Sequence, residues 1–286
     1  MKILIYGANG GLGLQLHKIL SQSSFTIIPY NFTDLDIRRE EVVLNSLKNK
    51  DFNLIIFSKG YEDIYNAEEN QQTAYDINTT GALNLAKICK EKDVPLIYLS
   101  TDYVFDGKKN TPYSPEDETN PLNTLGKSKL AGEKAIQEIL DKYYIIRTSK
   151  LFGEMRTNFI DELIEKARTG QDFKAFNDVK YTPTWTFTLS KTIDKLISTT
   201  KLKINYGIYH CTNSGSCTDF DLIAEVLHSL KLYNKLFPVK YAETDYKPEI
   251  PLYSVLDCSK SPGIRIDWRD AFHNYLKNKG LIQEDI

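Results

Sequence analysis

The first half of the 286-residue chain alternates short, continuously apolar runs with longer segments whose apolar positions recur every three or four residues. The apolar runs predict buried strands at residues 3–6, 25–29, 54–57, 96–100 and 143–146. The periodic segments predict helices at residues 12–21, 40–47, 74–92 and 127–139. Strands without a polar face, separated by helices, are typical of a parallel sheet that is covered on both sides. We therefore expect an α/β protein built on a Rossmann-type doubly wound parallel sheet.

Beyond residue 150 this alternation loosens. Two segments rich in Pro, Tyr and Thr predict loops and short strands, at residues 175–186 and 237–254. Periodic patterns predict helices at residues 158–169, 189–198, 219–230 and 270–279. We expect these elements to form a smaller, mixed α/β C-terminal lobe. We assign residues 1–149, together with about 188–213, to the Rossmann domain, and residues 150–187 and 214–286 to the second lobe.

Composition narrows the function classes. The chain has 36 Lys and Arg against 38 Asp and Glu, a net charge of −2 that favours neither nucleic acid nor an anionic membrane as a partner. The cysteines form no C-x-x-C pair and the histidines no metal-binding spacing, so we expect reduced thiols and no metal site. No apolar run approaches the ~20 residues of a membrane span, and the chain begins with a strand pattern rather than a signal peptide. We expect a cytoplasmic protein.

A glycine-rich loop follows the first predicted strand and opens the first predicted helix. Residues 7–13 read G-A-N-G-G-L-G. Gly7 permits a tight turn, Gly10 lets a pyrophosphate approach the backbone, and Gly13 lets helix and strand pack closely. The phosphates would bind amide groups at the positive end of the helix. The predicted contacts to a dinucleotide are those of Gly7, Asn9, Gly10, Gly11, Leu12 and Gly13.

The end of the second predicted strand leaves the choice between NAD and NADP open. An acidic residue there binds the ribose 2′-hydroxyl of NAD, and a nearby arginine accepts the 2′-phosphate of NADP. This chain has Pro29-Tyr30-Asn31, which is neither. Asp36 and Arg38 come later and are candidates for the adenine side of the site.

A series of motifs then resembles one family, the dTDP-4-dehydrorhamnose reductases of the extended short-chain dehydrogenase/reductase superfamily. After the glycine loop come L-D-I at 35–37, S-T-D-Y-V-F-D-G at 100–107, P-Y at 112–113, P-L-N at 121–123, G-K-S-K-L-A-G-E at 126–133 and I-I-R-T-S at 145–149. Further motifs are P-T at 183–184, G-I-Y-H at 207–210, N-S-G-S-C at 213–217 and S-V-L-D-C-S-K at 254–260. The resemblance covers nearly the whole chain and is most specific at residues 100–133.

The resemblance implies that NAD(P)H, with NADPH favoured, reduces a 4-keto nucleotide sugar bound between the Rossmann domain and the second lobe. The family's catalytic set is a Ser or Thr, a Tyr and a Lys. Thr101 matches the hydroxyl that polarises the carbonyl, and Lys129 matches the lysine that binds the nicotinamide ribose and lowers the pKa of the phenol. Leu125 occupies the tyrosine position, so the alkoxide formed by hydride addition lacks its general acid.

The remaining site residues also follow from the resemblance. The predicted cofactor contacts outside the glycine loop are Asp36, Ile37, Ser58, Lys59, Ser100 and Lys129. The predicted substrate contacts are Tyr61, Thr101, Asp102, Tyr103, Lys150, Thr182 and Trp185. This chain departs from the family where Lys150 replaces a tryptophan, Ile250 replaces an arginine expected to bind nucleotide phosphates, and Gln15 replaces a glutamate at a dimer contact. The resemblance leaves a homodimer open.

Two hypotheses therefore stand. In the first, the protein is a working sugar reductase in deoxysugar or surface polysaccharide biosynthesis, whose proton comes from water or another group. Tyr61 and Tyr103 are candidates for that group, although both are better explained as walls of the site. In the second, it is a pseudoenzyme that binds a dinucleotide, a nucleotide sugar or a protein partner and reduces nothing. Thr101 and Lys129 favour the first hypothesis, and Leu125, Lys150 and Ile250 favour the second.

Overall fold

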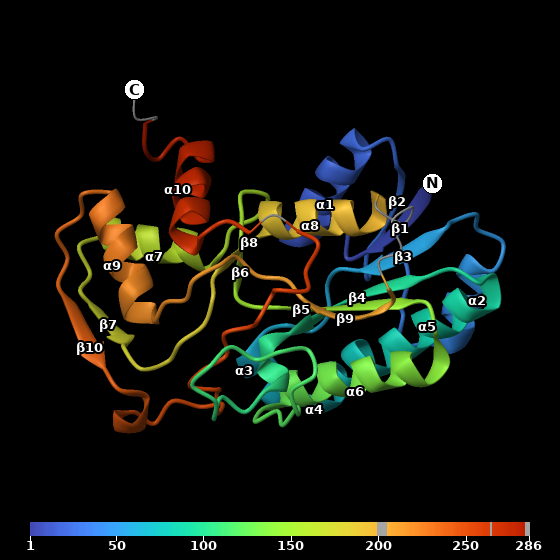
Figure 1. The fold of residues 1–286 in the computed structure, drawn as a ribbon, viewed down its shortest axis with the longest axis horizontal. Helices are drawn as coiled ribbons and strands as arrows, with labels where there is room; N and C mark the ends of the chain where they lie inside the picture. The colour runs from blue at the N-terminus through green and yellow to red at the C-terminus, as the bar shows by residue number, and fades with distance from the viewer. Residues whose placement is uncertain (199–204, 264, 284–286) are drawn as a thin grey trace.

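A six-stranded parallel sheet forms the centre of the first lobe in the computed structural model, which describes residues 1–198, 205–263 and 265–283 (Figure 1). The strand order is β2-β1-β3-β4-β5-β9. The strands are β1 (Lys2–Tyr6), β2 (Thr26–Tyr30), β3 (Leu54–Phe57), β4 (Leu96–Thr101), β5 (Tyr143–Thr148) and β9 (Gly207–His210). The predicted Rossmann-type α/β fold is thereby confirmed. The strand order reverses between β1 and β3, which is where such sheets bind ligands, at the carboxyl ends of the strands.

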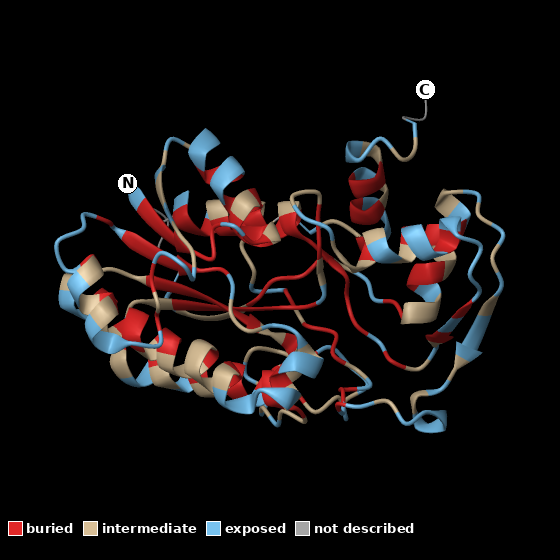
Figure 2. Cartoon of the chain, turned by 180° about the vertical axis from the view of Figure 1, so that it is seen from behind, coloured by how far each residue is buried: buried red, intermediate tan, exposed pale blue. Residues whose placement is uncertain are grey.

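Helices cover both faces of this sheet, as the uninterrupted apolar strands predict. One face packs against α1 (Gly11–Gln22) and α8 (Thr186–Ser198). The other packs against α2 (Glu40–Leu47), α5 (Gly81–Lys92) and α6 (Thr124–Ile139). The strands between them are almost wholly buried, apart from the two edge strands β2 and β9 (Figure 2).

The predicted helix over residues 74–92 is divided in the structure. It consists of α4 (Gln71–Tyr75), a π-helical segment η1 (Asp76–Thr80) and α5, and it is preceded by the short helix α3 (Ile64–Glu69). A π-helical turn inserts one extra residue per turn and often marks a functional position. It is centred on Asn78, whose side chain is bonded to neighbouring segments rather than packed among apolar residues.

The second lobe is smaller and mixed, as expected from its loosened pattern. Its helices are α7 (Phe159–Arg168), α9 (Asp219–Ser229) and α10 (Trp268–Asn278). Its strands form two parallel pairs, β6 (Leu151–Phe152) with β8 (Thr184–Trp185), and β7 (Phe173–Phe176) with β10 (Leu236–Val239). The described residues also include the 3-10 turns η2 (Asp102–Val104), after β4, and η4 (Tyr241–Glu243), after β10.

The second lobe is built from two parts of the chain that are separated by α8 and β9. Between its two parts, α8 and β9 pack with the Rossmann core, and β9 extends the sheet beside β5. Residues 199–204, within the range 188–213 assigned to the first domain, lie outside the described residues. All four cysteines are buried and unpaired. No helix in the described part of the chain has the length and apolarity that crossing a bilayer requires.

Candidate active site

The glycine loop joins β1 to α1 at the point where the strand order reverses. Gly7 has a φ of +85°, which favours glycine, and a Cβ on Gly13 would lie 2.1 Å from the carbonyl oxygen of Gly7. Gly10 caps α1 without any side-chain hydrogen bond to the first-turn amides. Those amides have no partner one turn back in the helix, so they suit an anion. A cavity of about 510 Å³ opens here, lined by residues 9–13 and by residues of the second lobe.

A smaller cavity of about 240 Å³ adjoins the loop on the β2 side and is lined by Tyr6, Phe32, Thr33 and Ile77, among others. Asn31, at the end of β2, accepts a hydrogen bond from the Asn9 amide at 2.9 Å, so its side chain holds the glycine loop. The carboxylate of Asp36 is bound by both Nε and Nη2 of Arg38 at 2.8 Å. Ile37 is fully buried and supports α5 at Gly81.

The segment after β3 crosses between the glycine loop and the catalytic positions. Ser58 donates a hydrogen bond to the Tyr6 carbonyl at 2.9 Å and thus ties β3 to β1. Lys59 lies over the loop, because a Cβ on Gly10 would meet the Lys59 Cδ at 3.1 Å. Lys59 lines both cavities, so its side chain lies beside the glycine loop and the amides at the start of α1.

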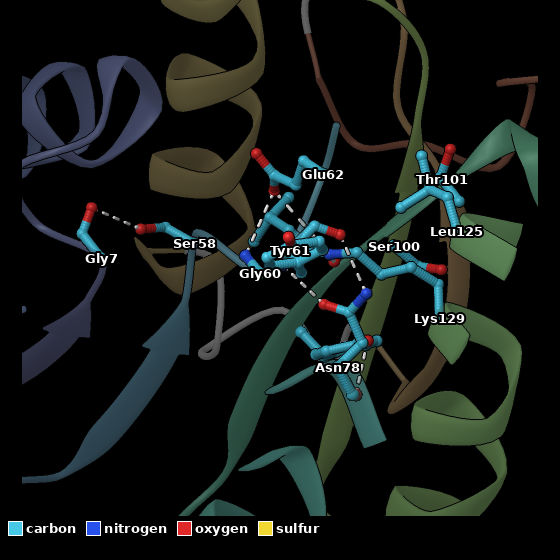
Figure 3. A network of polar contacts seen from close by, with 12 residues as sticks. Gly7, Ser58, Gly60, Tyr61, Glu62, Asn78, Ser100, Thr101, Leu125 and Lys129 are labelled. Carbon is cyan, nitrogen blue, oxygen red and sulfur yellow. Dashed lines mark hydrogen bonds and ion pairs between the residues drawn. The ribbon is translucent and has the colours of Figure 1, made fainter. Parts of the chain in front are cut away.

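Asn78 holds this segment in place and was not predicted from the sequence. Its Oδ1 accepts from the Tyr61 amide at 2.8 Å, and its Nδ2 donates to the Tyr61 carbonyl at 3.0 Å and to Ser128 at 2.9 Å. Figure 3 shows this network between Gly60, Tyr61 and the helix that carries Lys129. In the sequence, Asn78 is one of two asparagines, with Asn84, in the predicted helix over residues 74–92, and such a residue does not by itself reveal a site.

Lys129 is buried at the junction of α6 with the sheet. Its Nζ donates to the Leu99 carbonyl at 2.9 Å and lies 3.8 Å from a carboxylate oxygen of Glu62. Burial lowers the pKa of this ammonium, although the charges of Glu62 and Glu133 act in the opposite direction. A Cβ on Gly60 would lie 2.8 Å from Nζ, so only glycine fits the chain beside it.

Thr101 and Asp102 lie at the carboxyl end of β4. Thr101 is part-exposed; its hydroxyl donates to Asp102 Oδ1 at 3.1 Å and accepts from the Tyr103 amide. Asp102 is buried and accepts hydrogen bonds from Ser149 at 2.7 Å and Ser254 at 2.5 Å, and burial raises the pKa of its carboxyl. Asp102 therefore joins three segments and orients Thr101, rather than facing a ligand.

Ser100, predicted as a cofactor contact, is directed elsewhere. Its hydroxyl donates to Glu133, which also forms a buried ion pair with Arg147 at 2.7 Å. Buried charges need such complete pairing, because each ion has lost its hydration. The pair joins α6 to β5 beneath the site, so Ser100 belongs to the support of α6.

Leu125 occupies the first turn of α6, one turn before Lys129 and on the same face. Its side chain is 6% exposed and packs with Ala67, Ala74 and Tyr103, together with Tyr61 and Ile64. The side chain is therefore an ordinary apolar packing residue with no proton to donate. Burial raises the pKa of the Tyr103 phenol, which makes that hydroxyl a weaker acid than an ordinary tyrosine.

Lys150 follows β5 with a φ of +26° and points into the second lobe. Its Nζ lies 2.7 Å from Asp219 and 3.2 Å from the Tyr181 hydroxyl, so its charge is already paired. Lys150 and Asp219 line a cavity of about 400 Å³, together with Phe159, Leu163, Lys166, Lys174, Phe176 and further residues of α7, β7 and β10. This cavity combines aromatic walls with cations.

Thr182 and Trp185 are buried in the core of the second lobe. Thr182 donates to the Gly215 carbonyl at 2.8 Å, and Trp185 donates from Nε1 to Glu154 at 3.1 Å. Neither residue lines the three cavities named above. The structure thus groups the glycine loop, Lys59, Tyr61, Thr101 and Lys129 around one end of the sheet, and leaves these two residues as packing of the adjacent lobe.

Known proteins resemble this chain over nearly its whole length. The family model described as "RmlD substrate binding domain" matches residues 1–280. A spore coat polysaccharide biosynthesis protein of Bacillus subtilis is 31% identical, over 97% of this chain and 98% of that protein. The dTDP-4-dehydrorhamnose reductase of Clostridium acetobutylicum superposes with a TM-score of 0.92 at 33% identity, covering 98% of this chain and 100% of the other. The Bacillus anthracis reductase, solved in complex with NADP, gives 0.91 at 30% identity, covering 97% and 99%.

Proposed function

The chain belongs to the RmlD substrate-binding-domain family, and from this premise we propose that it catalyses the NAD(P)H-dependent reduction of a 4-keto nucleotide sugar, of the dTDP-4-dehydrorhamnose type. The observation that carries the proposal is the buried Lys129, whose ammonium reaches the carboxyl end of β4. A lysine buried at this position has no packing advantage over an apolar residue, because desolvation of the charge is costly. The presence of a lysine here despite this cost favours a role in binding and catalysis.

The cofactor in this proposal is a nicotinamide dinucleotide, which supplies the hydride when bound. The glycine loop would hold its diphosphate, and the cavity lined by Phe32 and Thr33 would hold its adenosine. NADPH is the favoured form, since the residue directly after β2 is Asn31 rather than an acid that would select a ribose 2′-hydroxyl, and Arg38 stacks on the Phe32 ring at 4.9 Å. The Bacillus anthracis reductase contains NADP, and a dehydratase that shares the fold at 15% identity contains NAD, so both cofactors need to be measured.

The substrate would span the cavity of about 400 Å³ in the second lobe and the catalytic positions. Phe159 and Phe176 offer aromatic surfaces for a nucleobase, and Lys166 and Lys174 offer positive charge for its phosphates. We assign the keto oxygen of the sugar to the Thr101 hydroxyl and the nicotinamide ribose to Lys129. With Leu125 in the tyrosine position, the C4 alkoxide takes its proton from water, which predicts slow turnover.

The biological setting in this proposal is deoxysugar or surface polysaccharide biosynthesis, as the name of the Bacillus subtilis relative suggests. A homodimer is the assembly to test, by light scattering during size-exclusion chromatography. The second candidate function is binding without reduction, and the specific observation in its favour is the apolar packing around Leu125.

Calorimetry tests the proposal before any turnover is sought. We expect the native protein to bind NADPH more tightly than NADH, and to bind a dTDP-sugar in a site that does not exclude the cofactor. Lys129→Met should weaken NADPH binding without changing the affinity for the dTDP-sugar. Failure of both nicotinamide cofactors to bind at millimolar concentration would reject the proposed reductase.

A further inference from the structure

A loop of the second lobe lies across the start of α1. Arg156, between β6 and α7, donates a hydrogen bond from Nε to the Asn9 carbonyl at 3.1 Å. A Cβ on Gly11 would lie 3.7 Å from the Cβ of Arg156, so the Arg156 side chain begins directly beside the first turn of α1. Arg156 lines the same cavity of about 510 Å³ as the glycine loop. The guanidinium of the second lobe is thereby held beside the amides of the first turn of α1.

Lys59, which belongs to the first lobe, also lies against the glycine loop. A Cβ on Gly7 would lie 2.5 Å from the Lys59 Cβ, and one on Gly10 would lie 3.1 Å from its Cδ. Lys59 lines both the larger cavity and the adjoining one of about 240 Å³. It therefore lies where the two cavities meet, along the glycine loop.

Lys59 and Arg156 differ from three other cations of the candidate site in their ion pairing. Among the described residues, neither Lys59 nor Arg156 forms an ion pair with a carboxylate, whereas those three do. Arg38 is paired with Asp36, Lys129 with Glu62 and Lys150 with Asp219. Two unpaired cations beside a helix N-terminus favour an anionic ligand that contacts both of them.

We propose that Lys59 and Arg156 clamp the dinucleotide's diphosphate from opposite sides, so that the second lobe takes a direct part in cofactor binding. This inference rests on the proposed function for the identity of the ligand. It also connects the two sites. Asn158 caps α7 and donates to the Gly153 carbonyl at 2.9 Å, so the loop that carries Arg156 is fixed to the helix whose Phe159 lines the substrate cavity.

The test compares Arg156→Gln and Lys59→Gln with the native protein in calorimetric titrations of NADPH and of inorganic pyrophosphate. Each substitution removes a charged hydrogen-bond donor, so each should weaken NADPH binding about tenfold, and the double variant about a hundredfold. The loss should shrink in high salt, because exposed charges are screened. Arg168→Gln and Lys134→Gln are the matched controls, as both residues are exposed and lie outside the named cavities. Both should bind like the native protein.

The two probes separate failure of the clamp from failure of the proposed function. If the variants fold, as judged by unchanged thermal unfolding, and bind both probes as tightly as the native protein, the clamp is refuted. An equal loss in the control variants would refute it as well, because the effect would then be one of net charge. If the native protein binds pyrophosphate through Lys59 and Arg156 but binds neither NADPH nor NADH, the anion clamp stands and the reductase function fails.

Discussion

Replacing Leu125 by tyrosine should convert a slow reductase into a faster one. Leu125 and Lys129 are one turn apart on α6, so a phenol at position 125 would point toward the Lys129 ammonium. A nearby positive charge lowers the pKa of a phenol from its usual value of about 10. The hydroxyl then becomes a general acid for the C4 alkoxide. Leucine has no proton to give, and burial makes the partly buried Tyr103 a weaker acid than this phenol.

The size of the effect has two parts. A positioned general acid is worth about 10² to 10⁴ in rate. The native side chain is only 6% exposed, with Ala67 and Ala74 among its neighbours, so the larger ring should cost about 1–3 kcal/mol of folding stability. Imperfect placement of the ring removes part of this rate increase. We expect at least a tenfold increase in kcat, with a lowered melting temperature.

The assay is NADPH oxidation with dTDP-4-keto-6-deoxysugar, comparing the native protein, Leu125→Tyr and Leu125→Phe at matched concentrations. The phenylalanine variant adds the same ring without the hydroxyl, so it should lose stability to a similar extent and gain no rate. Equal rates for the two variants would refute the proton-transfer explanation. A native protein that turns over rapidly and is slowed by Leu125→Tyr would show that Leu125 serves a different mechanism.

Three further predictions concern other parts of the site. Gly10→Leu should abolish cofactor binding and leave the fold intact, because its Cβ would lie 3.1 Å from the flexible Lys59 Cδ and 3.3 Å from the Gly7 carbonyl oxygen, which small shifts accommodate. Gly13→Ala should instead cost at least about 2 kcal/mol, because its Cβ would lie 2.1 Å from that oxygen. Titration and chemical denaturation separate the two. Glu133→Gln leaves the Arg147 charge buried and unpaired, so the free energy of unfolding should fall by about 3–5 kcal/mol in urea denaturation. Glu62→Gln removes a charge that raises the pKa of Lys129, so the loss of activity on raising the pH should begin at lower pH in kcat/KM profiles.

The sequence predicts those parts of the structure that depend on local patterns. The five apolar runs correspond to β1–β5, since a strand buried on both faces leaves an uninterrupted apolar run. Gly7 and Gly13 occupy their predicted geometries, because a tight turn and close helix–strand packing are each a requirement of the backbone at one position. The relation of Leu125 to Lys129 follows from the helical period alone.

Contacts between distant segments were not predictable in this way. Arg156 meets Asn9 across 147 positions, and nothing in its local sequence distinguishes it from a solvated arginine. Lys150 is paired with Asp219, which the sequence does not link to it. Asn78 lies in a π-helical turn, whose spacing gives no clear periodicity in the sequence. The alternation of side chains along β4 directs Ser100 toward Glu133, but Glu133 lies on α6, and the strand pattern does not show which helix residue it meets.

The most direct test of the central claim follows the hydride itself. NADPH that carries deuterium at the transferable C4 position is incubated with the native protein and dTDP-4-keto-6-deoxysugar, and the sugar product is analysed by mass spectrometry and NMR. The proposed reduction predicts slow formation of a 4-hydroxy sugar that carries deuterium at C4, and no such product with Lys129→Met. Calorimetric binding of both ligands with no labelled product above the protein-free control would contradict it and would leave a protein that binds both ligands without reducing the sugar.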